Sequence, residues 1–157
     1  MIGVQRAVAR CAAAALAALL FAGHVHAADG ARPAAAQATL PAAEWPAIKH
    51  VIETQLRALR AGDAAKAFSF AAPAIRAQFV TAENFLYQVR LGYDALLAAR
   101  RTEFLGGAVI DGNVIQPVRL VGADDTVRVA LYTMEKQDDG SWKITGCVLA
   151  PSTVQSA

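Results

Sequence analysis

Apolar residues between positions 44 and 61 recur three or four places apart, the spacing of one face of an α-helix. Pro46 is compatible with the first turn of such a helix, and Gly62 can end it in the left-handed conformation. We therefore predict a helix over 44–61, with His50 on the face opposite the apolar stripe and exposed to water. The stripe consists of Trp45, Ile48, Ile52, Leu56 and Leu59.

Shorter helical segments follow. Asp63 can cap a second helix, "DAAKAFSFAA", which ends before Pro73. The segment "PAIRAQF" offers a further turn, and Thr81 is a plausible cap for "AENFLYQVRLG". In this last helix the spacing places Phe85, Leu86, Val89 and Tyr93 on one face.

From Arg101 the apolar period changes from helical to alternating, and turn residues recur at regular intervals. The pattern predicts four strands, over 102–110, 113–121, 126–136 and 141–150, joined by short turns. Pro117 cannot donate to a ladder, so its strand has a free edge or a bulge there. "LGG" at 105–107 indicates a bend. We predict an α+β domain in which N-terminal helices pack on a curved antiparallel four-stranded sheet.

The first residues, "MIGVQRAVARCAAAALAALLFAGHVHA", have the order of a secretory signal. Arg6 and Arg10 precede an apolar stretch, and "VHA" fits a cleavage site after Ala27. The apolar run is too short for a membrane helix, which needs about 20 residues. We expect a signal peptide over 1–27, a flexible lead-in over 28–43, the domain over 44–151 and a tail over 152–157. The predicted location is periplasmic or secreted, with no membrane attachment after cleavage.

The remaining composition excludes several classes of protein. The chain has 15 Lys and Arg against 13 Asp and Glu, and cleavage would remove Arg6 and Arg10, leaving a net charge near zero. With no basic run, nucleic acid is not expected as a partner. Cys147 and His50 would be the only cysteine and histidine left, too few for structural zinc. Paired aspartates at predicted turns fit turn formation, so no metal or cofactor is predicted.

Three phrases, "IETQLRALRAGDAAKAFSFAAPAIRAQF", "ENFLYQVRLGYDAL" and "DDGSWKITGCVL", resemble the family of unknown function DUF4864. The order of elements from Trp45 to Pro151 also resembles the nuclear transport factor 2-like (NTF2-like, SnoaL-like, cystatin-like cone) superfamily. This resemblance implies a sheet curled around a cavity and carries no established activity. Enzymes of the superfamily often use an Asp/His or a Tyr/Asp pair in that cavity, and here His50 has no partner by position.

Tyr93 and Asp94 are the candidate acid/base pair. Tyr93 continues the apolar stripe of its helix, so its hydroxyl points inward and needs a partner. That partner can be a cavity ligand, with Asp94 nearby, or simply a backbone carbonyl, with Asp94 capping a turn. Gln116 is the one polar residue on the face of Val114, Val118 and Leu120. It is a candidate ligand-binding residue, although a strand-edge position explains it equally well.

A second candidate surface is the outer face of the sheet. Arg128 and Tyr132 alternate with Val127, Val129 and Leu131. If the apolar set faces the helices, Arg128 and Tyr132 face outward with Arg119 and Lys143, in a mixed polar and aromatic patch suited to dimerisation. In the alternative, Arg128 and Tyr132 line the cone, where the arginine could hold an anion.

The face of the sheet on which Cys147 lies depends on whether its strand alternates regularly. Strict alternation places Trp142, Ile144 and Val148 on one face and Cys147 on the other. We predict a bulge at Gly146, which turns Cys147 and Leu149 toward the helices and makes the thiol core filling.

These observations favour a secreted domain that binds a small apolar ligand or another protein without catalysis. A cavity enzyme using Tyr93 and Asp94 is the first alternative, and a homodimer formed through the outer sheet face is the second.

Overall fold

The computed structural model describes residues 39–151, with side chains to residue 150. The predicted signal peptide, most of the lead-in and the tail lie outside the described residues. A short 3-10 turn, η1, precedes five helices: η1 Ala42–Glu44, α1 Trp45–Ala61, α2 Ala64–Ser69, α3 Pro73–Phe79, α4 Ala82–Gly92 and α5 Asp94–Ala98. Among the described helices, none is both long enough and apolar enough to cross a membrane.

The long helix α1 begins one residue later than predicted, ends at the predicted residue and buries the predicted stripe. Pro46 lies in its first turn, and Gly62 ends it with φ of 74°. Ile48 and Ile52 are fully buried, whereas His50 is exposed. The predicted caps also form, because the side chains of Asp63 and Thr81 accept hydrogen bonds from the first turns of α2 and α4. The short helix α5 was not predicted, because its five residues are too few to establish a period.

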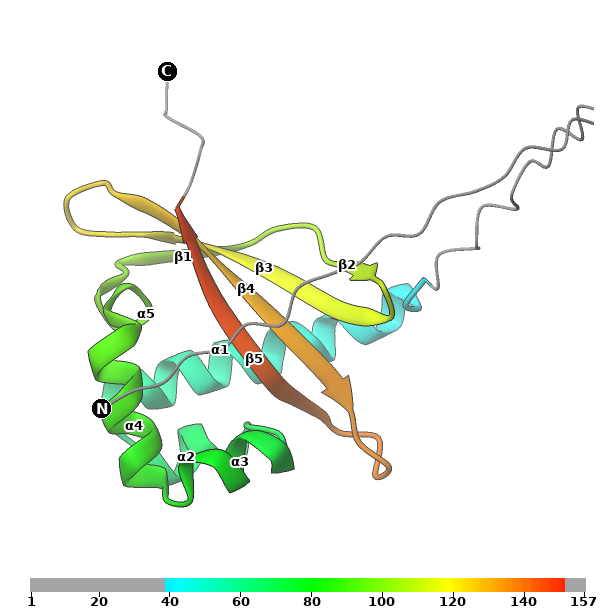
Figure 1. Cartoon of the computed structure of the whole chain (residues 1–157). Helices are drawn as coiled ribbons and strands as arrows, with labels where there is room; N and C mark the ends of the chain where they lie inside the picture. The colour runs from blue at the N-terminus through cyan, green and yellow to red at the C-terminus, as the bar shows by residue number, and fades with distance from the viewer. Residues whose placement is uncertain (1–38, 152–157) are drawn as a thin grey trace, which may run out of the picture. The chain divides into compact units, whose positions relative to one another are not determined.

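The sheet has five strands rather than four: β1 Arg101–Phe104, β2 Ala108–Ile110, β3 Asn113–Val121, β4 Val127–Lys136 and β5 Trp142–Pro151. All pairings between these strands are antiparallel, in the order β1-β3-β4-β5, and β2 also pairs with β3. The sheet lies over the helices, which cover one of its faces (Figure 1). The α+β prediction is therefore confirmed, with the first predicted strand divided in two.

β1 and β2 are separated by a short segment that contains Gly106 and Gly107. The ring of Trp45 lies so close to Gly107 that a Cβ there would be 2.1 Å from a ring atom. Pro117 faces this break, and its carbonyl accepts a hydrogen bond from the amide of Leu105 at 3.0 Å. The missing N–H of Pro117 therefore falls where β3 has no ladder partner, as the sequence predicted.

The register of β4 overturns one prediction. Tyr132 lies opposite Gln116, and residues directly opposite each other in an antiparallel pair share a face. Gln116, Val118 and Leu120 face the helices, so Tyr132 does too, and it is only 1% exposed. The prediction that Tyr132 and Arg128 face outward is wrong, because Val127, Val129 and Leu131 form the outer row instead.

The predicted bulge in β5 is confirmed. Thr133 pairs with Gly146 and Met134 pairs with Ile144, so Thr145 is the additional residue. The bulge reverses the alternation, which brings Cys147 to the helix side and leaves Val148 63% exposed on the other. Gln116, Tyr132 and Cys147 thus form one row across β3, β4 and β5 on the inner face.

Candidate functional site

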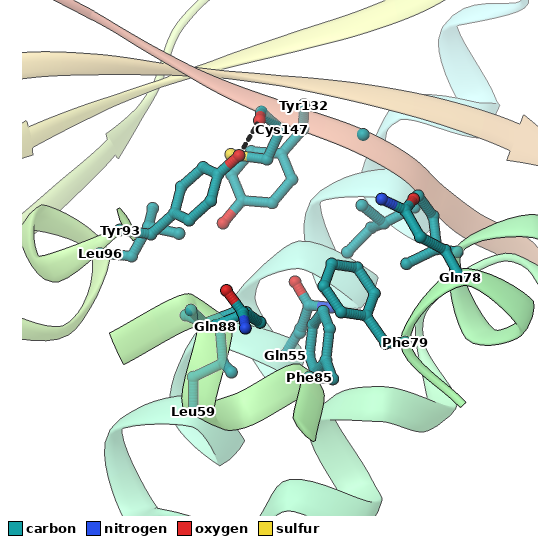
Figure 2. Close-up of a pocket in the computed structure, with 14 residues that line it drawn as sticks. Gln55, Leu59, Gln78, Phe79, Phe85, Gln88, Tyr93, Leu96, Tyr132 and Cys147 are labelled. Carbon is teal, nitrogen blue, oxygen red and sulfur yellow. Dashed lines mark hydrogen bonds between the residues drawn. The ribbon is translucent and has the colours of Figure 1, made fainter. Parts of the chain in front are cut away.

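A pocket of about 230 Å³ lies between the helices and the inner face of β4 and β5 (Figure 2). Its walls come from the second half of α1, from α3, α4 and α5, and from the sheet next to the bulge. They are mainly apolar and aromatic. The lining residues are Gln55, Leu59, Ile75, Gln78, Phe79, Phe85, Gln88, Val89, Tyr93, Leu96, Tyr132, Ile144, Gly146 and Cys147.

Tyr132 contributes a buried hydroxyl to this pocket. Four buried side-chain polar atoms lack a hydrogen-bond partner within residues 39–150, and the Tyr132 hydroxyl is the one that lines the pocket. Burial, followed by the neighbouring Cys147, raises the pKa of Tyr132 well above its usual value. The phenol therefore stays protonated at neutral pH and can donate a hydrogen bond. A buried hydroxyl without a partner costs about 1–3 kcal/mol.

Cys147 is partly buried beside Tyr132. Burial raises the pKa of its thiol to about 12, and the Tyr132 hydroxyl opposes this only in part. Because the thiolate is the reactive form of cysteine, a thiol with this pKa is a poor nucleophile. The prediction that Cys147 fills space rather than carrying out chemistry agrees with this environment.

The predicted pair of Tyr93 and Asp94 does not come together. Tyr93 turns inward and donates a hydrogen bond to the Cys147 carbonyl at 3.0 Å, the bond dashed in Figure 2. Asp94 begins α5, is exposed and lines a different cleft. The two side chains diverge because the chain starts a new helix between them. The structural alternative for Tyr93, satisfied by a backbone carbonyl, is therefore correct.

Three glutamines that the sequence analysis did not single out also line the pocket. Gln55 is buried, and its amide nitrogen donates to the Ala67 carbonyl at 3.2 Å. Its oxygen is turned toward the open space below Tyr132 (Figure 2). Gln78 and Gln88 are exposed and lie where the pocket meets solvent. Gln55 lies within the buried stripe of α1, between Ile52 and Leu59, and this spacing was the only available signal.

Gln116 is buried but does not line the pocket. Its amide nitrogen donates to the carbonyls of Leu105 and Pro117 at 2.8 and 2.9 Å. These bonds tie the break between β1 and β2 to β3. Gln116 therefore has a structural position, and its proposed role in a cavity is not supported by the lining of the pocket.

The remaining candidates lie away from the pocket. Arg119 faces outward and pairs with Glu103 at 3.0 Å. Lys143 alternates with the inward Trp142 and Ile144, and it donates to the Ser69 carbonyl at 2.8 Å. Arg128 is in the inward row, but at the open end of the sheet, where it is exposed and lines the cleft that includes Asp94 and Asp124.

The electrostatic character of the pocket follows from its lining. Among the described residues, its lining contains no aspartate, glutamate, histidine, lysine or arginine. Within the part of the chain that the structure describes, no group of three or more His, Cys, Asp or Glu residues could hold a metal ion. What the site offers is an apolar surface with a few neutral hydrogen-bonding groups, the usual composition of a small-molecule site.

The fold and the site thus define a small α+β domain with an uncharged pocket between its two layers. Residues 41–157 match the model of the family described as domain of unknown function (DUF4864), and the chain belongs to this family. No match was found among curated proteins or among solved structures.

Proposed function

We propose that this domain binds a small, mainly apolar molecule in the pocket beneath the β5 bulge. The observation that carries the proposal is the Tyr132 hydroxyl, which is buried, has no partner among the described residues and lines the pocket. Buried polar groups in folded proteins nearly always have a hydrogen-bond partner. A bound ligand would supply one here.

The pocket supports binding better than catalysis. A general acid or base works best with a pKa near the working pH. The pKa values of Tyr132 and Cys147 are both raised, to about 12 for the thiol. Asp94, the acid of the enzyme hypothesis, lines another cleft. We therefore favour a binding module over the alternative of a cavity enzyme that uses Tyr93 and Asp94.

The direct test is native mass spectrometry of the protein purified from its natural source. We expect an additional mass that is lost on denaturation. A matched pair of variants locates it. Ile75→Phe fills the pocket and should abolish retention, whereas Leu91→Phe alters an α4 side chain that is 65% exposed and should not. Retention that is equal in the two variants would contradict binding in this pocket.

We also propose that the domain is an NTF2-like cone and that it acts in the periplasm or outside the cell. The first is supported by the order of helices and curved antiparallel sheet, with a cavity between the layers. The second rests on the sequence of residues 1–27. N-terminal sequencing of the mature protein from a cell fraction tests the second point, with a new terminus at Ala28 expected.

A second candidate function is self-association through the outer sheet face. Val148 is 63% exposed there, and it lies opposite Leu131 in the outer row. Arg119 remains on this face, whereas the Lys143 ammonium is bound to the Ser69 carbonyl of α2, and Arg128 and Tyr132 are in the inward row. A two-fold pair is the commonest form of homo-oligomer. Light scattering should show a dimer that Val148→Asp dissociates and the α4 control Leu91→Asp does not. A wild-type monomer at high concentration would exclude it.

A further inference from the structure

The polar groups inside the pocket point to the chemical class of its ligand. Resting on the proposed binding function, we infer that the ligand is a neutral molecule about the size of one substituted ring, carrying an alcohol or amide group that meets Tyr132 and Gln55.

Size sets the first limit. The pocket measures about 230 Å³. That is more than the roughly 150 Å³ of an apolar cavity known to bind benzene. It is less than the roughly 300–1,000 Å³ of sites for drug-sized ligands. A single ring with a short substituent fits this range, and a long acyl chain or a fused polycyclic molecule does not.

Charge sets the second limit. All the side chains that line the pocket are neutral. The guanidinium of Arg60 does not line the pocket, but its charge acts on the Tyr132 hydroxyl, and its Nε donates to the carbonyl of Leu96 at 3.0 Å. Removing an ion from water without a partner costs several kcal/mol. An ammonium group would have no counter-charge here, and a carboxylate would have none among the side chains that line the pocket, so we infer a neutral ligand.

Hydrogen bonding sets the third limit, because the two inner polar groups have complementary roles. The Tyr132 hydroxyl has no hydrogen-bond partner among the described residues and acts as a donor. The amide nitrogen of Gln55 is held by the Ala67 carbonyl, which leaves the Gln55 oxygen as an acceptor. Both atoms are turned toward the same open space (Figure 2). A group that accepts from Tyr132 and donates to Gln55 satisfies both, and alcohols and amides do so without charge.

Three probes of nearly equal size separate these requirements: benzyl alcohol, ethylbenzene and benzylammonium. Each is titrated into the full-length protein, and binding is followed by the NMR shifts of the Ile75 and Ile144 methyl groups, which line the pocket. We expect benzylammonium to bind at least about 10-fold more weakly than benzyl alcohol. Equal affinities for these two would overturn the requirement for a neutral ligand.

The variant Tyr132→Phe removes the hydroxyl and preserves the ring. It should weaken benzyl alcohol about 3- to 10-fold and leave ethylbenzene unchanged or slightly tighter, as expected for one neutral hydrogen bond. Tyr87→Phe is the matched control, because Tyr87 is 57% exposed on α4 outside this pocket. It should change neither affinity.

The outcomes separate the two levels of the proposal. If all probes bind but Tyr132→Phe affects benzyl alcohol and ethylbenzene equally, the ligand class is wrong and pocket binding stands. If no probe, ethylbenzene included, shifts the methyl resonances, the proposed binding function itself fails. Should Tyr132→Phe not fold, the ranking of the probes on the wild-type protein decides the question.

Discussion

The two halves of α1 face the same side of the sheet but differ in what lies against them. The first half is tightly packed: Ile48 and Ile52 are fully buried, and Trp45 lies against the backbone of Gly107. The second half, with Gln55 and Leu59, borders the pocket. Leu56 and Leu59 are also no more than 3% exposed, so the contrast lies in the open space beside the second half and not in its burial.

The largest expected effect compares the packed end of α1 with the α3 wall of the pocket. Ile52→Ala removes a fully buried side chain and should lower the free energy of unfolding by about 2–5 kcal/mol. Ile75→Ala is the matched change at the pocket, where the side chain is only partly buried, and should cost less than half as much. Urea denaturation measures both. Equal losses would mean that the pocket end is packed as tightly as the other.

A smaller effect is expected where Trp45 meets the sheet. Gly107→Ala places a methyl group against the indole ring and should cost about 1–3 kcal/mol of unfolding free energy. Gly106→Ala is the control, since a Cβ at Gly106 meets no atom within 4 Å. Denaturation curves that shift equally for the two variants would show that the Trp45 contact is not tight.

Within the pocket, two tyrosine hydroxyls should behave in opposite ways. Tyr93→Phe loses the bond to the Cys147 carbonyl and should cost about 0.5–1.5 kcal/mol. Tyr132→Phe loses no hydrogen bond to the residues that the structure describes, so the ligand-free protein should keep or slightly gain stability. Both are measured by urea denaturation without ligand. A loss in Tyr132→Phe as large as that in Tyr93→Phe would reveal a protein partner for Tyr132.

The smallest expected effect is on the pH dependence of stability, through Glu44 immediately before α1. Glu44 accepts hydrogen bonds from Lys136 at 2.6 Å and from the Trp142 indole at 2.8 Å, and these lower the pKa of its carboxyl below the usual 4.5. Its contribution to stability is therefore present above pH 4.5 and is lost as the pH falls through the lower folded-state pKa.

Glu44→Gln should therefore reduce the loss of unfolding free energy between pH 7 and pH 3. The control is Glu53→Gln, which removes a carboxylate that is 61% exposed and lies 3.9 Å from Arg57. The pH dependence of this variant should match that of the wild type. If Glu44→Gln also matches the wild type, the Lys136 and Trp142 contacts do not perturb the carboxyl.

The sequence predicted local features of the fold well. The stripe and caps of α1, the cap residues Asp63 and Thr81, and the bulge beside Gly146 all depend on residues close together in the chain. The prediction of which face of β4 points toward the helices was wrong, because apolar residues occupy both of its rows. Val129 and Leu131 are on one row, and Ala130, Tyr132 and Met134 are on the other. Only pairing with β3 decides between them.

The candidate site was harder to predict. Tyr93 was expected to point inward, and it does, but Asp94 diverges from it at the start of α5. Tyr132 was predicted on the outer face of the sheet, whereas it is buried on the inner one. Gln55 was not predicted, because only the apolar residues around it on α1 indicated that it is buried. A pocket depends on how far side chains from several elements reach toward one another, and that information is not local.

The bulge in β5 has a further consequence for the edge of the sheet that β5 forms. The backbone of Ile144 is already paired there, because it accepts from the Ala72 amide at 2.8 Å and donates to the Phe70 carbonyl at 2.9 Å. Immediately afterwards Thr145 breaks the regular repeat. A strand from another molecule would find neither open amides at Ile144 nor a continuous register beyond it. The irregularity that turns Cys147 inward thus also makes this edge of β5 a poor template for a further strand.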